Sequence, residues 1–252
     1  MALSFRHAEI IEIARVDGRV VVEKLAERFQ VTLQTIRRDL AELADAGLLD
    51  RVLGGAVLRT GVTNFGYEER RRMNDAAKEA IGRACAQAIP NDCSLILNLG
   101  TTTEAVAREL LKHTNITVVT NNINVANILL ANESCEIMVA GGALRRSDGG
   151  LVGDLTSDFI GQFKVDYAII GASALDGDGD LLDFDLPEVR VSRAIIRQSR
   201  KVFLVTDSSK LQRSAPVMLC SLAEIDVIFT DRPLPDDLAK KCKDWGTEIR
   251  LA

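Results

Sequence analysis

The chain has 252 residues, of which 47% are hydrophobic and 27% are charged, as in an ordinary globular protein. Thirty-one basic and 36 acidic residues give a formal net charge of -5, which excludes attraction to nucleic acid by a positive charge over the whole molecule. The length accommodates two domains. No apolar run approaches the ~18 residues of a membrane span, and no secretory signal is recognisable, so we expect a cytoplasmic protein without a membrane partner.

Helical periodicity marks three consecutive segments near the N-terminus. Apolar residues recur every three or four positions in Phe5–Val16 and in Val22–Phe29. After a turn at Gln30–Val31, a third helix is predicted from its N-cap Thr32 to the stop signal Gly47. Its expected apolar face consists of Leu33, Ile36, Leu40, Leu43 and Ala44. Two helices joined by so short a turn are typical of a helix-turn-helix.

The other face of the third helix carries amide, hydroxyl and guanidinium groups close to its N-terminal end. A helix that enters the DNA major groove needs such groups, because Arg pairs with guanine, Gln with adenine, and hydroxyls or flanking Arg with phosphate. An ordinary surface helix with solvated arginines fits this helix, taken alone, equally well. The expected DNA contacts are Thr32, Gln34, Thr35, Arg37, Arg38 and, just beyond the helix, Arg51.

Two short strands, Leu48–Val52 and Ala56–Arg59, are predicted around a hairpin turn at Gly54–Gly55. Three helices and a hairpin predict a winged helix-turn-helix domain over residues 1–59. This segment has nine basic and nine acidic residues, so affinity for DNA must come from the placement of individual arginines, Arg59 among them. Doubling the DNA contacts through oligomerisation would also raise the affinity for DNA, which favours a homo-oligomer, either a dimer or a tetramer.

A family resemblance appears in this segment. The run Gln34-Thr35-Ile36-Arg37-Arg38-Asp39-Leu40, with Leu43, Gly47 and Gly54-Gly55-Ala56 after it, resembles the DNA-binding signature of the DeoR family of bacterial repressors. Leu33 departs from the pattern, which commonly has Pro there. The resemblance implies a transcriptional repressor that binds double-stranded operator DNA.

Residues 60–74 read as a linker between domains. Gly61 and Gly66 are loop residues, and Glu68–Arg72 is a run of charges without an apolar face. We expect these charges to be solvated; a contact with DNA or with a partner subunit is the less favoured alternative.

Short apolar strands alternate with helical segments over residues 75–252. The predicted strands are 94–99, 116–119, 136–140, 167–170, 202–205 and 227–229, and the predicted helices are 75–88, 103–112, 123–131, 155–162, 186–199 and 236–243. Strands that are apolar on both faces, separated by amphipathic helices, predict a doubly wound, mostly parallel α/β sheet.

Small polar turns follow five of these strands. They are Gly100–Thr103, Thr120–Asn122, Gly141–Gly142, Gly171–Ser173 and Thr206–Lys210. In open α/β sheets, ligands bind along the carboxyl edge of the strands, near the point where the strand order reverses. The turns therefore predict a binding pocket on one edge of the sheet.

A phosphate is the ligand group that suits the turn Gly100-Thr101-Thr102-Thr103. Its glycine lets backbone approach a ligand, and the free N–H groups of the helix that opens there favour an anion. Neither a G-x-x-x-x-G-K-[ST] nor a G-x-G-x-x-G motif is present, so we expect no ATP, NAD or other cofactor. Asn121, Gly141, Gly142 and Lys210 would complete the site; ordinary turn residues and a surface lysine are the alternative.

The acidic loop Asp176–Asp185 lacks the residue order of an EF-hand, and the five cysteines lack metal-binding spacing, so we expect no metal site. The cysteines suit buried apolar positions in a reducing compartment. Asp183, Asp185 and Glu188 are candidate acceptors for sugar or polyol hydroxyls. N-terminal charges for the helix that begins near Leu186 are an equally good interpretation.

The second half of the chain also resembles the DeoR family. The similar segments are Gly100-Thr101-Thr102, Thr120-Asn121-Asn122, Ala140-Gly141-Gly142, Asp183-Phe184-Asp185 and Asp207-Ser208-Ser209-Lys210. The resemblance implies an effector domain related in fold to ribose-5-phosphate isomerase that senses phosphorylated sugars. Residues 119–127, 149–153, 182–185 and 188–190 are most similar to members that respond to glycerol 3-phosphate, which is the effector the resemblance implies.

The favoured hypothesis is a repressor, with no catalytic residues, whose operator binding is relieved by a phosphorylated sugar or polyol. The alternative is a sugar-phosphate isomerase with a DNA-binding domain, in which Asp183, Asp185 or Glu188 is the general base and Lys210 stabilises an enediolate. A DNA-binding domain has no use in an enzyme, which disfavours this alternative. An architectural DNA binder without a ligand is a third interpretation.

Overall fold

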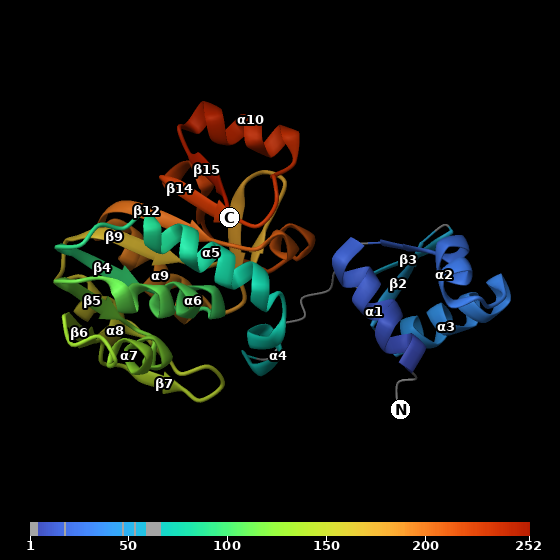
Figure 1. Cartoon of the computed structure of the whole chain (residues 1–252), viewed down its shortest axis with the longest axis horizontal. Helices are drawn as coiled ribbons and strands as arrows, with labels where there is room; N and C mark the ends of the chain where they lie inside the picture. Colours follow the sequence, from blue (N-terminus) through green and yellow to red (C-terminus); the bar gives the residue numbers. More distant parts are fainter. Residues whose placement is uncertain (1–4, 18, 47, 53, 59–66) are drawn as a thin grey trace. The chain divides into compact units, whose positions relative to one another are not determined.

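The computed structural model describes residues 5–17, 19–46, 48–52, 54–58 and 67–252 (Figure 1). The chain divides into two compact units, residues 1–63 and residues 64–252. The predicted helix stop at Gly47, Arg59 at the end of the second predicted strand and the first part of the predicted linker, 60–66, lie outside the described residues.

The first unit contains three helices and a small antiparallel sheet. Its elements are α1 Phe5–Asp17, β1 Arg19–Val21, α2 Val22–Phe29, α3 Leu33–Asp45, β2 Leu49–Val52 and β3 Gly55–Leu58. The sheet order is β1-β3-β2, so the predicted hairpin gains a third strand from the residues before α2. The carbonyl oxygen of Val20 would lie 1.9 Å from a Cβ atom at position 55, so only glycine fits there.

The predicted apolar face of α3 is largely confirmed. Ile36, Leu40 and Leu43 are buried in one cluster with residues of α1 and α2, such as Ile10 and Leu25. The prediction was wrong for Leu33, which is 42% exposed because it opens the helix, before the first turn that packs on the core.

A parallel sheet forms the centre of the second unit. Among its described residues seven strands pair in the order β15-β14-β12-β9-β4-β5-β6. They are β4 Cys93–Leu97, β5 Ile116–Thr120, β6 Cys135–Val139, β9 Val165–Ile170, β12 Ser199–Val205, β14 Val227–Thr230 and β15 Glu248–Leu251. The chain builds outward from β4 to β6, then returns to β9 on the other side of β4. The strand order therefore reverses between β4 and β9.

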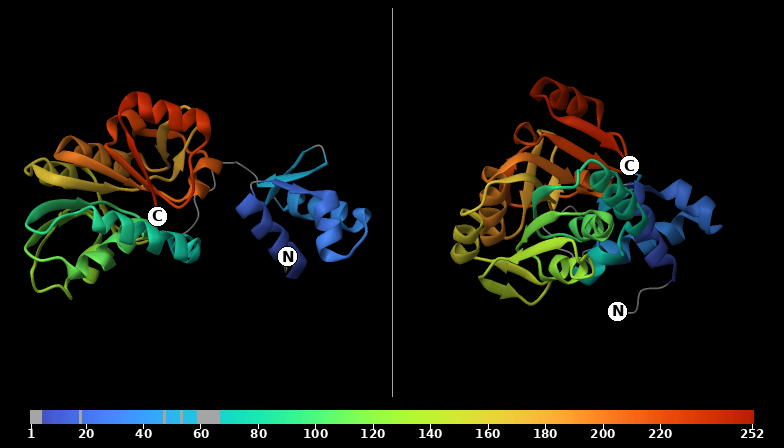
Figure 2. Two further views of the ribbon diagram at one scale, coloured as in Figure 1. Left: turned by 45° about the horizontal axis from the view of Figure 1, so that its top comes forward. Right: turned by 60° about the vertical axis from the view of Figure 1, so that its left-hand side comes forward.

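Helices cover both faces of this sheet (Figures 1 and 2). One core packs α5 Asp75–Gln87, α6 Thr101–Glu109 and α7 Ile123–Leu129 on one face, and the other core packs α8 Asp154–Ile160, α9 Leu186–Arg197 and α10 Asp236–Trp245 on the opposite face. The predicted doubly wound α/β architecture is confirmed.

Several short elements were not predicted from the sequence. The strands β10 Ala174–Leu175, β11 Asp180–Asp183 and β13 Val217–Ser221 form a separate antiparallel sheet, and β7 Ala143–Arg145 pairs with β8 Gly150–Val152. Short 3-10 helices are η1 Leu110–Lys112, η2 Ser208–Gln212 and η3 Leu222–Glu224. In the loop between β10 and β11, Asp176 accepts hydrogen bonds from the backbone N–H groups of Asp178, Gly179 and Asp180, so its carboxylate organises a turn.

The second half of the predicted linker differs from expectation. Tyr67–Arg72 forms helix α4, and the Tyr67 hydroxyl donates to the Glu104 carboxylate of α6 at 2.9 and 3.1 Å. Arg70 is half-buried rather than solvated. The charge run has no apolar face, yet these polar contacts make it part of the second unit.

The cysteines carry no disulfide. Cys85, Cys220 and Cys242 are buried, whereas Cys93 and Cys135 are partly exposed. Burial raises the pKa of the Cys220 thiol to about 12, so it stays protonated at neutral pH. No group of three His, Cys, Asp or Glu side chains within the described ranges is arranged to hold a metal ion. None of the helices in those ranges has the length and apolar run needed to cross a lipid bilayer.

Candidate functional site

The N-terminal end of α3 presents polar groups to solvent. Thr32 caps the helix, since its hydroxyl oxygen accepts the backbone N–H of Thr35 at 3.1 Å, as predicted. Thr32 and Gln34 are exposed and Thr35 is half-exposed. All three line a surface hollow together with Arg38. These four of the proposed DNA contacts therefore share one accessible face.

The arginines of this region lie on two hollows. Arg38 is 82% exposed, and its Nε donates to Glu42 Oε1 at 2.9 Å, one helical turn further on. Arg37 and Arg51 line a second hollow beside Gly54, at the hairpin. An exposed pair such as Arg38–Glu42 adds only about 0.3–0.5 kcal/mol to stability, so Arg38 can leave it for a DNA group at little cost.

A buried polar cluster behind this face was not predicted. Asp39 is buried on α3 and accepts hydrogen bonds from Arg6 Nε at 2.5 Å and Arg6 Nη2 at 3.0 Å. The His7 ring lies 3.4 Å from the same carboxylate. Although burial opposes the charged form, Arg6 and His7 lower the pKa of Asp39. The cluster joins the start of α1 to the middle of α3.

A polar pocket lies in the second unit where the strand order reverses. We call it the sheet-edge pocket. It is formed by residues at the carboxyl ends of β4, β9 and β12, by β11, by α4 and α9, and by η2. They are Arg70, Leu99, Gly100, Thr101, Thr102, Thr103, Gly171, Ala172, Ser173, Asp183, Glu188, Val205 and Lys210. Seven of the eleven predicted effector residues line it: Gly100, Thr101, Thr102, Thr103, Asp183, Glu188 and Lys210.

The turn from β4 into α6 is rigidly held. Gly100 has a φ of 140°, which side chains rarely allow. The Thr103 hydroxyl donates to the carbonyl oxygens of Asn98 and Gly100, at 2.9 and 2.6 Å. Thr103 therefore stabilises the turn, while Thr101 and Thr102 remain at the pocket wall with the first N–H groups of α6.

Lys210 provides a cation to the pocket. Burial and the neighbouring Arg213, Arg70 and Lys78 lower the pKa of its ammonium to about 7. Asp207 opposes this effect, and its own pKa is lowered by Lys210 despite burial. An anion in the pocket would favour the charged form of Lys210, because it would offset the repulsion from the surrounding cations.

Two carboxyl groups lie on the same pocket. Asp183 accepts hydrogen bonds from the Ser173 hydroxyl at 3.0 Å and from the Phe184 N–H at 2.7 Å. Burial raises the pKa of Asp183 nonetheless. Burial and the neighbouring Asp183 raise the pKa of Glu188 to about 7, against the effect of Arg145. Both groups are placed to hydrogen-bond a ligand hydroxyl.

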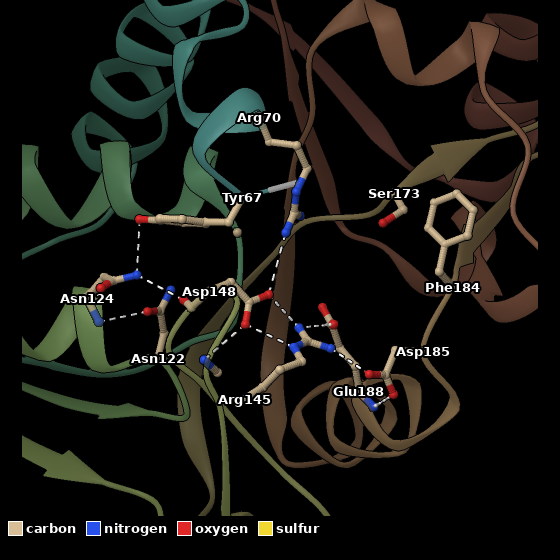
Figure 3. A network of polar contacts seen from close by, with 12 residues as sticks. Tyr67, Arg70, Asn122, Asn124, Arg145, Asp148, Ser173, Phe184, Asp185 and Glu188 are labelled. Carbon is tan, nitrogen blue, oxygen red and sulfur yellow. Dashed lines mark hydrogen bonds and ion pairs between the residues drawn. The ribbon is translucent and has the colours of Figure 1, made fainter. Parts of the chain in front are cut away.

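Arg145 connects the β7–β8 hairpin to α9 (Figure 3). Its guanidinium contacts Asp148, Asp185 and Glu188, each at 2.6 Å. Asp185 also caps α9 by accepting the Glu188 N–H at 3.2 Å. The sequence left open whether Asp185 contacts a ligand or caps the helix, and the structure places it in the cap, outside the lining of the pocket.

Three predicted effector residues lie elsewhere. Asn121 is fully buried and donates to the Leu151 carbonyl at 3.2 Å. The Gly141 carbonyl accepts the Thr156 hydroxyl at 2.7 Å, and a Cβ atom at position 142 would lie 2.0 Å from that hydroxyl. These residues shape the ends of β5 and β6, in keeping with the turn chemistry that was the alternative for them.

Sequence reasoning missed four residues around the pocket, namely Tyr67, Arg70, Arg145 and Asp148. Arg70 was read as part of a solvated charge run. The signal that could have identified it is its position: a run of arginines directly before the first helix of an anion-binding domain offers cations to that domain.

A helix-turn-helix unit with an exposed polar helix face, joined to an α/β unit with a polar pocket, is the organisation of a ligand-responsive transcription regulator. The DeoR-like helix-turn-helix domain matches residues 6–61, and the DeoR C terminal sensor domain matches residues 73–232. The chain belongs to the DeoR family of transcriptional repressors.

Relatives of known name match almost the whole chain. The glycerol-3-phosphate regulon repressor of Escherichia coli (strain K12) is 46% identical over 246 residues, which is 98% of each chain. The Haemophilus influenzae protein of the same name is 43% identical over 251 residues, 100% of this chain and 98% of the relative. The repressor CsqR of Escherichia coli is 35% identical, over 98% and 94% of the two chains. These relatives are repressors, so the chain is a regulator rather than an enzyme, and the isomerase alternative is not supported.

Solved structures are similar to part of the chain. Ribose 5-phosphate isomerase A from Methanocaldococcus jannaschii covers 55% of each chain with 14% identity and a TM-score of 0.41. The eIF2B beta protein from Chaetomium thermophilum covers 61% of this chain and 48% of its own, with 15% identity and a TM-score of 0.45.

Proposed function

We propose that the protein represses transcription from an operator and is released from it by a phosphorylated polyol, with glycerol 3-phosphate as the effector. The observation that carries the proposal is the meeting of Lys210 with the N-terminus of α6 in one pocket that also holds two carboxyl groups. A cation and free N–H groups suit a phosphate, and carboxyl groups suit hydroxyls. The names of the two relatives that are 43% and 46% identical support the choice of glycerol 3-phosphate.

In the proposed complex the phosphate binds at Gly100–Thr102 and Lys210, and the hydroxyl groups face Asp183 and Glu188. Asp185 acts indirectly, by holding Arg145 and the start of α9. Of the residues proposed from the sequence, Asn121, Gly141 and Gly142 support neighbouring backbone without touching the ligand.

In the proposed operator complex α3 enters the major groove. Gln34 and Arg38 contact base edges, whereas Thr32, Thr35, Arg37 and Arg51 contact phosphates. A dimer would present two such helices to two half-sites, and a tetramer would present two such pairs. Light scattering on the purified chain measures its oligomeric state directly.

One experiment tests both halves of the proposal. A duplex is selected from random DNA by the full chain, and its binding is followed by fluorescence anisotropy while glycerol 3-phosphate is added. Release by glycerol 3-phosphate, with none by glycerol or by inorganic phosphate at the same concentration, is the expected result. Selection of no duplex would refute operator binding, and unchanged anisotropy with every phosphorylated polyol or sugar tested would refute the effector.

A further inference from the structure

Helix α4 is the first described element of the second unit, and it contacts the sheet-edge pocket. Residues 59–66 lead into it from the helix-turn-helix unit. The Tyr67 hydroxyl at its start donates to Glu104. It also accepts from Asn124 Nδ2 at 3.0 Å (Figure 3). Burial and the neighbouring Glu104 raise the pKa of Tyr67 to about 12, so the hydroxyl keeps its proton at neutral pH. Any movement of α4 must therefore change contacts with α6, the helix that opens at the proposed phosphate site.

Arg70 reaches from α4 into the pocket with an incomplete set of contacts. Its Nη2 lies 3.5 Å from Asp148 Oδ2, at the limit of a hydrogen bond. Its Nε is buried and has no hydrogen-bond partner within the described residues. A buried N–H of a charged group without a partner is unfavourable, so Arg70 would gain by contact with a nearby anion.

Asp148 does not depend on Arg70. Arg145 contacts its two carboxylate oxygens at 2.9 and 2.6 Å, and the Gly150 N–H donates to it at 3.2 Å. Figure 3 shows Arg70 and Arg145 approaching Asp148 from different elements. If Arg70 turned away, Asp148 would keep its stronger partner. The long contact between Arg70 and Asp148 is therefore the one that a ligand can replace most easily.

We propose that Arg70 exchanges Asp148 for the phosphate of the effector, and that this exchange moves α4 and so carries the signal toward the DNA-binding unit. The inference rests on the proposed function and adds to it a further ligand and the regulatory contact. A ligand shifts an equilibrium only through contacts that differ between the two states. The Arg70–phosphate contact is such a contact, because it replaces the Arg70–Asp148 contact of the structure described here.

The position of Arg70 also explains why the signal starts at the phosphate. Lys78 Nζ of α5 donates to the Arg70 carbonyl oxygen, so the backbone of α4 at Arg70 is held by a second basic residue. Both Arg70 and Lys78 belong to the cations that surround Lys210. A dianionic phosphate attracts Arg70 and Lys78 together, whereas an uncharged polyol attracts neither.

The test compares three variants of the full chain with the wild type. Arg70→Gln removes the proposed ligand, and Asp148→Asn weakens the contact that is to be replaced. Arg72→Gln is the matched control, since it removes the same charge from an exposed residue of the same helix. Glycerol 3-phosphate affinity is measured by calorimetry, DNA release by anisotropy, and folding by circular dichroism and thermal midpoint.

We expect Arg70→Gln to bind glycerol 3-phosphate at least about tenfold more weakly and to keep its DNA even when the effector saturates it. Asp148→Asn should bind the effector more tightly, because the competing contact is weaker, and Arg72→Gln should resemble the wild type.

Wild-type affinity and wild-type DNA release in a folded Arg70→Gln variant would overturn the inference while leaving the proposed function intact. Full DNA release by saturating effector in that variant would overturn the relay through α4. Absence of glycerol 3-phosphate binding by the wild type would instead refute the proposed function, and this inference with it.

Discussion

Asp39 of α3 and Arg6 of α1 form a two-point ion pair, with Arg6 Nε 2.5 Å from one carboxylate oxygen and Nη2 3.0 Å from the other. Asp39 is only 4% exposed, so its charge requires a partner. The pair fixes α3 against α1, the helix that begins the domain. It also holds the Arg6 guanidinium beside the hollow that contains Gln34 and Arg38.

Asp39→Asn is expected to lower the free energy of unfolding of the first unit by about 1–3 kcal/mol, because it leaves Arg6 without its charged partner. The pKa of Asp39 is lowered in the folded state, so its contribution is fully present above the unfolded value of about 3.9. That contribution disappears as the pH falls through the lower, folded-state value. Calorimetric unfolding of the full wild-type and variant chains at pH 7 and at pH 3 measures this contribution. An equal loss of unfolding free energy in Asp39→Asn at both pH values would contradict the ionic explanation.

Arg38→Ala is expected to weaken operator binding by about 5- to 150-fold, as loss of one bidentate base contact would. Effector affinity should not change, since Arg38 lies in the other unit. Arg197→Ala removes the same charge from an exposed residue of α9 and serves as the control. Anisotropy with the selected duplex gives the operator affinities of Arg38→Ala and of the control variant. A wild-type operator affinity for Arg38→Ala would refute the assignment of α3 to the groove.

Thr102→Glu is expected to give a repressor that binds DNA and ignores glycerol 3-phosphate. Thr102 lies in the pocket wall at the start of α6, so a carboxylate there would repel the phosphate. Thr102→Ser keeps the hydroxyl and should respond as the wild type does. The readout is again DNA release, and normal release from the Glu variant would refute binding of the phosphate at Gly100–Thr102.

Effector affinity is expected to fall as the pH rises above about 7. The pKa of free Lys210 is lowered to about 7, so at pH 8 most of the free protein has a neutral lysine. Binding of a phosphate favours the charged form and therefore takes up a proton. Calorimetry at pH 8 in two buffers of different ionisation enthalpy should show an uptake approaching one proton per site. Lys210→Met should take up much less and should bind more weakly, the remaining uptake coming from Glu188, whose pKa is also about 7.

The elements that depend on local residue pattern could be predicted from the sequence. The Thr32 cap, the buried Ile36 and Leu40, and the apolar strands follow from spacing and from turn chemistry over a few residues. The burial of Asp39 depends on Arg6, which lies 33 residues away, and no local pattern indicates it.

The same limit applies to the pocket. Gly100–Thr103 and Lys210 carry recognisable anion-binding chemistry in their own turns, and the structure brings them together. Arg145 contacts Asp185 across 40 residues, and Arg70 contacts Asp148 across 78. Such pairs are set by strand order and by a hairpin too short to be recognised from its sequence. Asn121 and Gly142 were assigned to the ligand because they end strands, yet those strands lie on the far side of β4 from β9.

The place of the pocket at the reversal of strand order has a consequence for protein synthesis. Gly100 and Lys210 stand on opposite sides of that reversal, so a nascent chain cannot form the proposed effector site until about 210 residues have been translated and the middle strands have assembled. The helix-turn-helix unit, with a core of its own, is finished long before. A premature stop codon after the helix-turn-helix unit but before Lys210 would thus yield a product that keeps the helix-turn-helix fold and lacks the proposed effector site.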